Sequence, residues 1–324
     1  MQSAAQLVAS GTRNRPGRFA LLLAFLVVYL VWGSTYLAIR YAVETIPPLL
    51  AVVVRQGLAG LAIFSYAWWR GYRPTLREWR ASLVLGTLYF AIGHGTMHWA
   101  ETVVPSGLTA LLVASEPIWI AVMAALVSRE ERLTRSTIFG LLLGVAGVAL
   151  LMRAEAGAGH SHLLLGCIAI LIGAVSWACG VIYTRNPSIP RDPVARAGMA
   201  AMCGAAVLIL PAIFSGELSR AHPSMFSARS IWALLYLIFF GSILAFTTYT
   251  WLLDHCSPTL VSTHTYVNPI IAVLLGWALA GEILNTRLLM AGLITLLAVF
   301  LIRRGTGEGR EQHKLVAGRA EEAA

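Results

Sequence analysis

Ten long apolar runs, separated by short polar segments, make up most of the chain. Each run has about 20 residues, the length that an α-helix needs to cross the hydrocarbon core of a bilayer. The runs lack period-2 alternation and are too long for strands, so they favour helices. The pattern predicts an all-α integral membrane protein with ten transmembrane helices, at 19–39, 49–69, 81–100, 106–127, 134–152, 163–183, 195–214, 230–251, 258–279 and 286–302.

Composition restricts the class of protein. Of the 324 residues, 58% are hydrophobic and 12% are charged, and the mean hydropathy is +0.73. A soluble fold of this size needs more polar surface. A soluble enzyme, a disordered chain and a nucleic-acid-binding module are therefore excluded. The net charge of +9 does not indicate nucleic acid, because most basic residues lie between the apolar runs. The expected surroundings are a lipid bilayer.

The positions of the basic residues predict the orientation in the membrane. With ten helices both termini lie on one side, and arginines concentrate in cytoplasmic segments. The opposite side has only Arg40, Arg153, Arg220, Arg229 and Arg287. We therefore expect a cell-membrane protein with a cytoplasmic segment at 1–18 and a disordered cytoplasmic tail at 303–324. The basic residues on the terminus side are Arg13, Arg15, Arg18, Arg70, Arg73, Arg77, Arg80, Arg129, Arg132, Arg135, Arg185, Arg191, Arg196, Arg303, Arg304, Arg310, Lys314 and Arg319.

The two halves of the chain repeat each other. An offset of 145 matches Trp32 with Trp177, and an offset of 152 matches later positions more strongly. The halves at 19–152 and 163–302 hold five helices each, and because five is odd the second half enters the membrane inverted. Inverted repeats are typical of secondary transporters, although channels and membrane enzymes also have them. The pairs at offset 152 are Trp99/Trp251, Pro117/Pro269, Glu130/Glu282, Thr134/Thr286, Arg135/Arg287 and Gly140/Gly292.

Two passages resemble a known family. One is the first-helix string VWGSTYLAIRYAVETIPPLL, followed by RQGLAG. The other is a Pro–Glu–Thr–Gly pattern with fixed spacing, which occurs in both halves at the offset of 152. Over residues 19–302 the chain resembles the EamA-like members of the drug/metabolite transporter superfamily.

The resemblance implies a fold and a class of function. It implies ten helices in two inverted five-helix repeats, and secondary transport of small metabolites, often amino acids and commonly outward. One branch of the superfamily moves nucleotide sugars and sugar phosphates, which need buried cations at their phosphates. This chain has no lysine in any predicted helix and only Arg55 well inside one, which argues against a phosphorylated substrate.

Glu116 is the sharpest candidate at membrane depth. Charged residues there are costly and usually face a bundle interior or a cavity. Glu116 precedes Pro117, which frees a backbone carbonyl one turn earlier and bends the helix. Such a carboxylate binds an ammonium group or carries a proton; the alternative is a protonated side chain bonded to a neighbouring helix. Its repeat partner is the neutral Asn268, before Pro269.

Three histidines lie in the apolar runs. His94 and His98 share a helix face with Glu101 at i, i+4 and i+7. The spacing is compatible with a metal, but no third ligand is evident, so we predict no metal site. Lining a cavity where protons bind and structural hydrogen bonding remain as interpretations. His264 shares a face with Asn268 and is a further candidate for cavity lining.

Aromatic, hydroxyl and basic side chains complete the predicted binding or coupling site. Trp32 and Tyr36 form a stripe with Tyr29, and Trp177 repeats Trp32. At the midplane these rings form cavity walls that accept a ring or a cation, or they simply pack. Ser34 bonds the backbone or a substrate. Arg55 binds a substrate carboxylate, pairs with a protein carboxylate or extends outward.

Other repeated positions have structural interpretations. Glu130 and Glu282 lie at helix–helix turns, four residues before a threonine, so capping of the following helix is expected. Gly140 and Gly144 form a GxxxG motif, which suits packing within one chain or a homodimer contact.

The sequence favours a transporter over other membrane functions. No Walker A or HExxH motif occurs, so we expect neither an ATPase nor a metalloprotease, no cofactor and no enzyme activity. The predicted function is export of amino acids or related metabolites, with protons as a possible coupling ion. The alternatives are export of drugs, sugars or other metabolites, and a non-transporting membrane scaffold.

Overall fold

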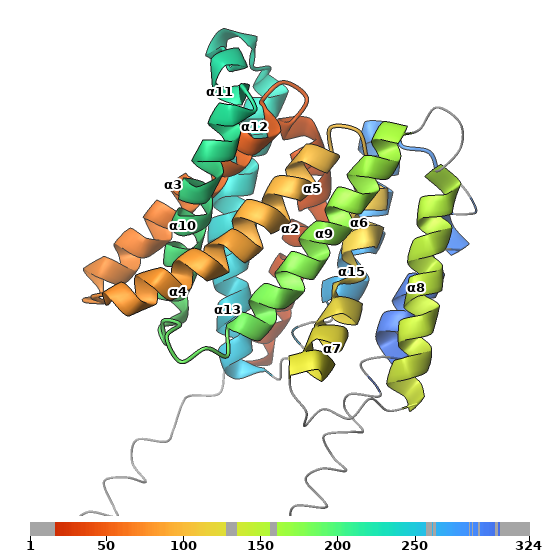
Figure 1. The fold of residues 1–324 in the computed structure, drawn as a ribbon, viewed down its shortest axis with the longest axis horizontal. Helices are drawn as coiled ribbons and strands as arrows, with labels where there is room; N and C mark the ends of the chain where they lie inside the picture. Colours follow the sequence, from red (N-terminus) through yellow and green to blue (C-terminus); the bar gives the residue numbers. More distant parts are fainter. Residues whose placement is uncertain are drawn as a thin grey trace, which may run out of the picture.

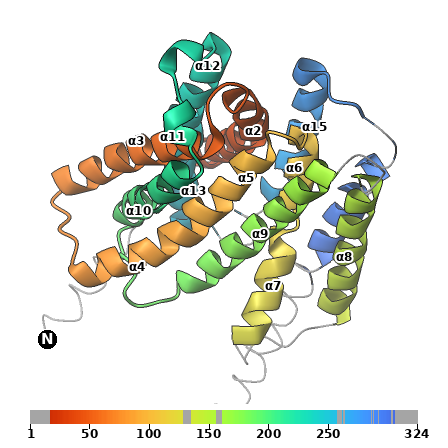
Figure 2. The ribbon, with the colours of Figure 1, turned by 45° about the horizontal axis from the view of Figure 1, so that its top comes forward.

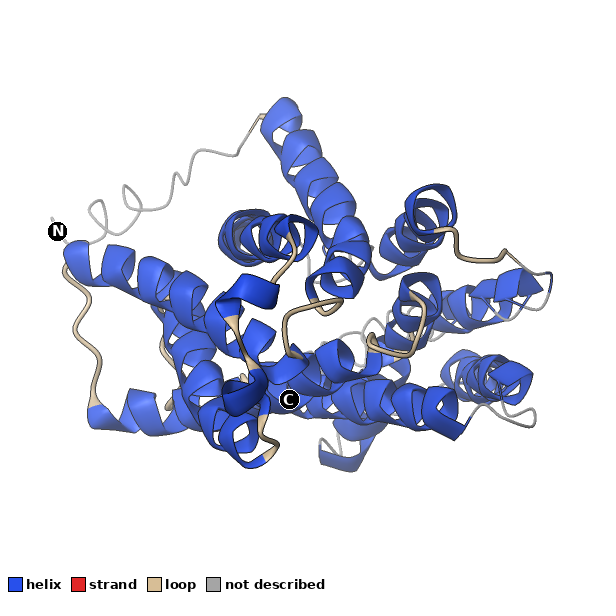
Figure 3. Ribbon diagram, turned by 90° about the horizontal axis from the view of Figure 1, so that it is seen from above, coloured by secondary structure: helices blue, strands red, loops and turns tan. Residues whose placement is uncertain are grey.

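The computed structural model describes residues 17–127, 135–155, 161–256, 261, 264–284, 286, 288–290, 292–301 and 304. Within this part the chain is made of helices and loops, with no strand (Figure 3). The helices of the first half are α2 (Arg18–Ala42), α3 (Pro48–Trp69), α4 (Leu76–Gly86), η1 (Thr87–His94), α5 (Gly95–Ala100), α6 (Ser106–Val113), α7 (Glu116–Val127) and α8 (Arg135–Glu155).

The second half is also helical. Its helices are α9 (Ser161–Tyr183), α10 (Pro193–Phe214), α11 (Glu217–Arg220), η2 (Pro223–Met225), α12 (Ala228–Tyr236), η3 (Leu237–Leu244), α13 (Ala245–His255) and α15 (His264–Ala280). Beyond them, residues 288–290 and 292–301 are also helical. Apart from the short α11 and η2, the described helices overlap the apolar runs that the sequence predicts.

Five helices in the described part are long and apolar enough to cross a membrane. They cover Arg18–Ala42, Pro48–Trp69, Ser161–Tyr183, Pro193–Phe214 and Ala228–Tyr249. Large apolar side chains point outward from them, including Phe19, Trp69, Ile172, Phe214 and Trp232. Such an outer surface suits hydrocarbon and would be costly in water. The other apolar helices are shorter.

Two π-helical segments occupy corresponding places in the two halves. η1 follows α4 and precedes α5 without a break, and η3 lies in the same way between α12 and α13. η3 begins 150 residues after η1, close to the offset of 152 at which the predicted repeat matches residues of the two halves. π-turns widen the helix and misalign its backbone bonds, and they are frequent at functional sites.

Some of the backbone oxygens in these segments accept side-chain hydrogen bonds. The indole N–H of Trp32 donates to the carbonyl of Gly241 in η3 at 3.1 Å. The hydroxyl of Ser176 donates to the carbonyl of Leu88 in η1 at 2.8 Å. Both donors come from the opposite half of the chain, so the π-segments are tied across the molecule.

Local sequence sets where α4 begins. Thr75 and Glu78 form a capping box, in which the Thr75 hydroxyl accepts from the Glu78 N–H and the Glu78 carboxylate accepts from the Thr75 N–H. Partial burial raises the pKa of Glu78, but hydrogen bonds from Thr75 and from the Tyr72 hydroxyl outweigh it and hold the pKa below its usual value. The charged cap fixes the entry of the chain into the third apolar run.

The fourth apolar run is interrupted. α6 ends at Val113, Ala114 and Ser115 form a turn, and α7 begins at Glu116. Pro117 lacks the N–H that would bond the carbonyl four residues earlier, so the helix opens there. The Ser115 hydroxyl donates to the carbonyl of Leu112 at 2.6 Å and stabilises the turn. The bend that Pro117 predicts is therefore present.

Helices of the two halves interleave, so that helices of one half pack against helices of the other. α10 lies against α3, α4 and η1, α9 against η1, α5 and α7, and α2 against α12, α13 and α15 (Figures 1 and 2). Glycines allow the closest approaches. A Cβ on Gly86 would lie 2.2 Å from the carbonyl oxygen of Ala200 in α10. The backbones of α4 and α10 are thus in direct contact, as small residues permit.

The glycine-rich face of α8 is used within this chain. A Cβ on Gly144 would meet Ile118 of α7 and Ala298, and one on Gly147 would meet Thr295. The packing interpretation of the GxxxG region therefore accounts for these two glycines. The homodimer stays a prediction.

Candidate functional site

Trp32 lies in a ring cluster formed by both halves. Its ring centroid lies 4.9 Å from that of Tyr249, 5.1 Å from His264 and 6.4 Å from Phe246. Tyr249 also contacts His264 at 5.6 Å. The cluster is half-buried, and the indole N–H of Trp32 is engaged with η3. The predicted site residues Trp32 and His264 are therefore neighbours, although 232 residues separate them in the chain.

Trp177 forms a second cluster with His94. The two rings are stacked at 5.8 Å with 7° between their planes. Tyr89 lies 4.3 Å from Trp177, and Phe90 lies 5.2 Å from His94. The Phe90 and Phe246 rings, 6.3 Å apart, connect this cluster to the Trp32 cluster. Predicted candidates from helices far apart in sequence thus line one continuous aromatic layer.

Consecutive residues of α3 reach both π-segments. The Arg55 Nε donates to the Ser242 hydroxyl in η3 at 3.0 Å. The next residue, Gln56, donates through Nε2 to the Nδ1 of His94 at the end of η1, at 2.9 Å. Arg55 and Gln56 are 3% and 1% exposed. Through these two hydrogen bonds, α3 links the π-helical segment η1 of the first half to η3 of the second half.

Several buried polar atoms beside Arg55 have no hydrogen-bond partner among the described residues. They are the Arg55 Nη1, the His98 Nε2 and both carboxylate oxygens of Glu101. His98 and Glu101 are fully buried. The Nδ1 of His98 donates to the carbonyl of His94 at 2.8 Å, and the Arg40 Nη1 donates to the backbone carbonyl of Glu101 at 2.6 Å. Native proteins rarely leave buried polar atoms unsatisfied.

Glu116 and Tyr36 lie near this group. Glu116 is half-buried at the first position of α7, directly after the break in the fourth run. Tyr36 on α2 lies close enough to Glu116 and Glu101 for their charges to act on it. The structure thus brings the predicted site residues Glu116 and Tyr36 near Glu101, which the sequence places on the His94/His98 face.

Two candidates are engaged in hydrogen bonds inside the protein. The Ser34 hydroxyl contacts the carbonyl of Val31 at 2.9 Å and the hydroxyl of Tyr236 at 2.7 Å. Asn268, oriented so that its amide nitrogen faces acceptors, donates to the carbonyls of Tyr29 and His264. Pro269 lies inside α15, which continues through it. Asn268 therefore contacts Tyr29 on the first helix rather than opening a break, unlike Glu116.

Glu282 caps a helix, but not the one that follows it. Its carboxylate accepts from the N–H and hydroxyl of Ser106 at 2.7 Å each and from the N–H of Gly107 at 2.9 Å. These groups are the N-terminus of α6 in the other half. The capping role was predicted correctly and the capped helix wrongly, because helix packing decides which N-terminus lies near a carboxylate. Glu130 lies outside the described residues.

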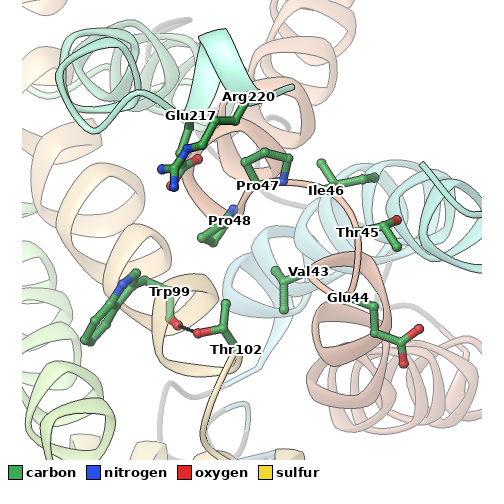
Figure 4. Close-up of a pocket in the computed structure, with 10 residues that line it drawn as sticks. All are labelled: Val43, Glu44, Thr45, Ile46, Pro47, Pro48, Trp99, Thr102, Glu217 and Arg220. Atoms are coloured by element: carbon green, nitrogen blue, oxygen red, sulfur yellow. Dashed lines mark hydrogen bonds between the residues drawn. The ribbon is translucent and has the colours of Figure 1, made fainter. Parts of the chain in front are cut away.

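An open pocket of about 390 Å³ lies on another face of α5. Trp99 and Thr102 line it, one residue after His98 and Glu101, together with the α2–α3 loop and α11 (Figure 4). Glu217 accepts from the Leu50 N–H at 3.0 Å and so caps α3. Burial raises the pKa of Glu217, although the backbone N–H groups of Leu50 and Leu49 act to lower it. None of the predicted site residues lines this pocket.

No group of three or more His, Cys, Asp or Glu side chains within the described part of the chain is arranged to hold a metal ion. His94 and His98 stack at 6.0 Å, and each uses its Nδ1 in a hydrogen bond.

Comparison with known proteins identifies the family. The EamA-like transporter family matches residues 18–153 and again residues 164–304. The chain belongs to the EamA-like transporter family. The "Uncharacterized inner membrane transporter YedA" of Escherichia coli strain K12 is 35% identical over 284 residues, which are 87% of this chain and 90% of the relative.

Other relatives extend the comparison. The "Probable amino-acid metabolite efflux pump" of Salmonella typhimurium is 29% identical over 296 residues, covering 86% of this chain and 95% of that protein. A solved crystal structure, at 19% identity and a TM-score of 0.61, shares the fold over 88% of this chain and 98% of that one. This member of the EamA-like family is therefore a multi-pass membrane protein related to transporters.

Sequence reasoning left two buried polar residues of this EamA-like protein, Gln56 and Glu101, out of the predicted site. Gln56 directly follows Arg55 in the second apolar run, and its uncharged side chain gives a weaker signal there than the guanidinium of Arg55. Glu101 lies on the His94/His98 face, but at the end of the run it resembles a loop residue. Its complete burial is set by contacts between α5 and other helices, which the local sequence does not reveal.

Proposed function

We propose that this chain is a secondary transporter, not an enzyme, which exports amino acids or related small metabolites by alternating access through the centre of ten transmembrane helices. The observation that carries the substrate class is the similarity over 86% of the chain to a protein named as an amino-acid metabolite efflux pump. The observations that favour alternating access are geometric.

The ring pairs at the centre support an inverted repeat. Trp32 packs on Phe246 and Trp177 packs on His94. The offset of 145 converts Trp32 into Trp177, and the offset of 152 converts His94 into Phe246. Exchanging the two halves therefore exchanges the two contacts. Two similar halves that meet in this way permit two mirror-related states, each open to one side.

The proposed translocation site lies at this meeting of the halves. It consists of the Trp32 and Trp177 clusters, with Glu116, Tyr36, His94, His98 and Arg55 beside them. His264, Ser34 and Asn268 hold the surrounding helices in place. Both termini face the cytoplasm in this proposal, as the arginine distribution predicts.

The test is transport by purified protein in liposomes loaded with mixed amino acids. We expect selective release of a few of them, faster than from protein-free liposomes, and faster still with an imposed pH gradient if protons are coupled. Release of drugs, sugars or other metabolites, but of no amino acid, would replace the substrate class. Folded protein that releases none of these compounds would contradict transport itself and leave a membrane scaffold.

A further inference from the structure

We propose that Arg55, His98 and Glu101 form a binding site for a zwitterionic ligand, with Arg55 for its carboxylate and Glu101 with His98 for its ammonium group. This inference rests on the proposed transport function and names the chemistry of its substrate. It adds Glu101, which the sequence places on the His94/His98 face but not among the predicted site residues.

The free atoms of the three residues are complementary to such a ligand. The Arg55 Nη1 is a donor without a partner among the described residues, while its Nε is held by Ser242. Both Glu101 oxygens are acceptors without a partner. The His98 Nδ1 must carry the proton, because it contacts a carbonyl oxygen, so the Nε2 of the neutral ring is a third acceptor. An ammonium group offers three N–H donors to three such acceptors.

The protein itself does not satisfy these groups. Arg55 and Glu101 act on each other electrostatically, yet they form no ion pair in the described part of the chain. A guanidinium and a carboxylate that are not paired with each other complement a molecule that carries both an anionic and a cationic group. A ligand of no net charge also leaves the balance of the buried site unchanged.

The neighbouring charges do not compete for these atoms. Arg40 is committed to the backbone carbonyl of Glu101, and Glu282 is committed to the N-terminus of α6. His94, which stacks on His98, is bonded to Gln56. Among the fully buried side-chain atoms of this group, those without a hydrogen-bond partner in the described part of the chain are the Arg55 Nη1, the His98 Nε2 and both Glu101 oxygens.

The positions of the three residues indicate where the apolar part of the ligand would lie and when the ligand could enter. His98 lies in the last turn of α5 and Glu101 directly follows the helix at i+3, so the two side chains lie on the same side of it. The stacked His94 and Trp177 rings continue that face and offer an apolar wall. The three side chains are closed off in this conformation, so ligand reaches them in another state of the alternating-access cycle.

The experiment compares three probes that differ by one charged group. L-phenylalanine carries both charges, phenethylamine lacks the carboxylate, and 3-phenylpropanoate lacks the ammonium. Binding to the full chain in lipid nanodiscs is measured by ligand-induced thermal shift and calorimetry. We expect wild type to bind the zwitterion at least about tenfold more tightly than either analogue. The other amino acids are screened in the same way.

Substitutions test which residue binds each charged group of the ligand. Glu101→Gln should weaken zwitterion binding about tenfold or more and leave 3-phenylpropanoate nearly unaffected. Arg55→Gln should also weaken zwitterion binding about tenfold or more, but should leave the binding of phenethylamine nearly unaffected. Glu101→Asp and Arg55→Lys keep the charge if a neutral variant fails to fold, and should retain the preference for the zwitterion. The controls are Glu44→Gln and Arg229→Gln, a surface pair 3.6 Å apart, which should change nothing.

The outcomes separate this inference from the proposed function. Zwitterion binding with the expected variant pattern, but without release from liposomes, would support the site and contradict transport. Amino-acid release that Glu101→Gln and Arg55→Gln leave unchanged would support transport and overturn the site. Failure of wild type to bind any amino acid, or equal binding of the three probes, would also overturn it.

Discussion

At the residue scale, the polar residues of the apolar runs fall into two groups. Ser34, Gln56 and Asn268 have hydrogen-bond partners inside the protein, which offset the free-energy cost of removing these side chains from water. Arg55, His98 and Glu101 keep unpartnered atoms. An unsatisfied buried donor or acceptor costs about 1–3 kcal/mol. Such a cost is compatible with folding when ligand binding requires those atoms.

Glu116 allows a prediction at this scale. Glu116→Gln preserves the size of the side chain but removes its ability to release and take up a proton. We expect pH-gradient-driven transport to fall at least about tenfold, while counterflow exchange of the same substrate continues. Both are measured in liposomes with a substrate identified by the release screen.

The surface variant Glu44→Gln is the control and should behave like wild type in both assays. An undiminished response of Glu116→Gln to the pH gradient would show that another group carries the proton, or that protons are not coupled.

At the scale of elements, irregular helices are the main feature that the hydrophobic pattern only partly predicts. The α6–α7 break follows from Pro117, whose missing N–H can be read from the sequence. The π-segments have no comparable marker. Their extra residue per turn is stabilised by partners from the other half, such as Trp32 on η3 and Ser176 on η1.

Pro117→Ala tests the function of the break. Alanine restores an N–H that bonds the Val113 carbonyl, so α6 and α7 should fuse and the free energy of unfolding should rise by about 1–3 kcal/mol. Transport should slow severalfold, because the joint beside Glu116 is lost. Denaturant unfolding in detergent and initial transport rates provide the two measurements.

Pro269→Ala is the matched control, because Pro269 lies in the repeat-equivalent position of a helix that is continuous. It should stabilise the protein without slowing transport. Equal slowing by both variants would argue that helix rigidity in general, not the α6–α7 joint, limits transport.

At the scale of the whole molecule, the halves are interleaved through close contacts between backbones. α3 from the first half and α10 from the second are packed through glycines on both helices. A Cβ on Gly60 would lie 2.7 Å from the Met202 backbone nitrogen, and one on Gly198 would lie 2.6 Å from that of Phe64. Arg55 and Gln56 are carried by the same α3, so this contact also positions the candidate site.

Two glycines one helical turn apart test this packing. Gly60→Ala should lower the free energy of unfolding by about 1–3 kcal/mol, because the new methyl group meets backbone atoms that cannot move alone. Gly57→Ala, whose nearest neighbour would be 3.8 Å away, should raise it by about 0.5–1 kcal/mol through helix propensity. Reversible denaturant unfolding in detergent distinguishes them, and equal effects would contradict the close packing.

The sequence by itself determined the helical class, the helix positions to within a few residues and the bend at Pro117, because apolar periodicity, run length and a missing N–H are local properties. It also singled out Arg55, His98 and Asn268, which the structure buries, because polar residues are few in the apolar runs.

Only the tertiary structure decided which of these residues meet. Burial of Glu101, capping of α6 by Glu282, the partners of Arg55 and Gln56, and the two π-segments all depend on contacts between residues far apart in the chain. Several packings of the same apolar faces satisfy the hydrophobic pattern equally well. The glycine contacts and the geometry of hydrogen bonds select one of them, and neither is a property of a single segment.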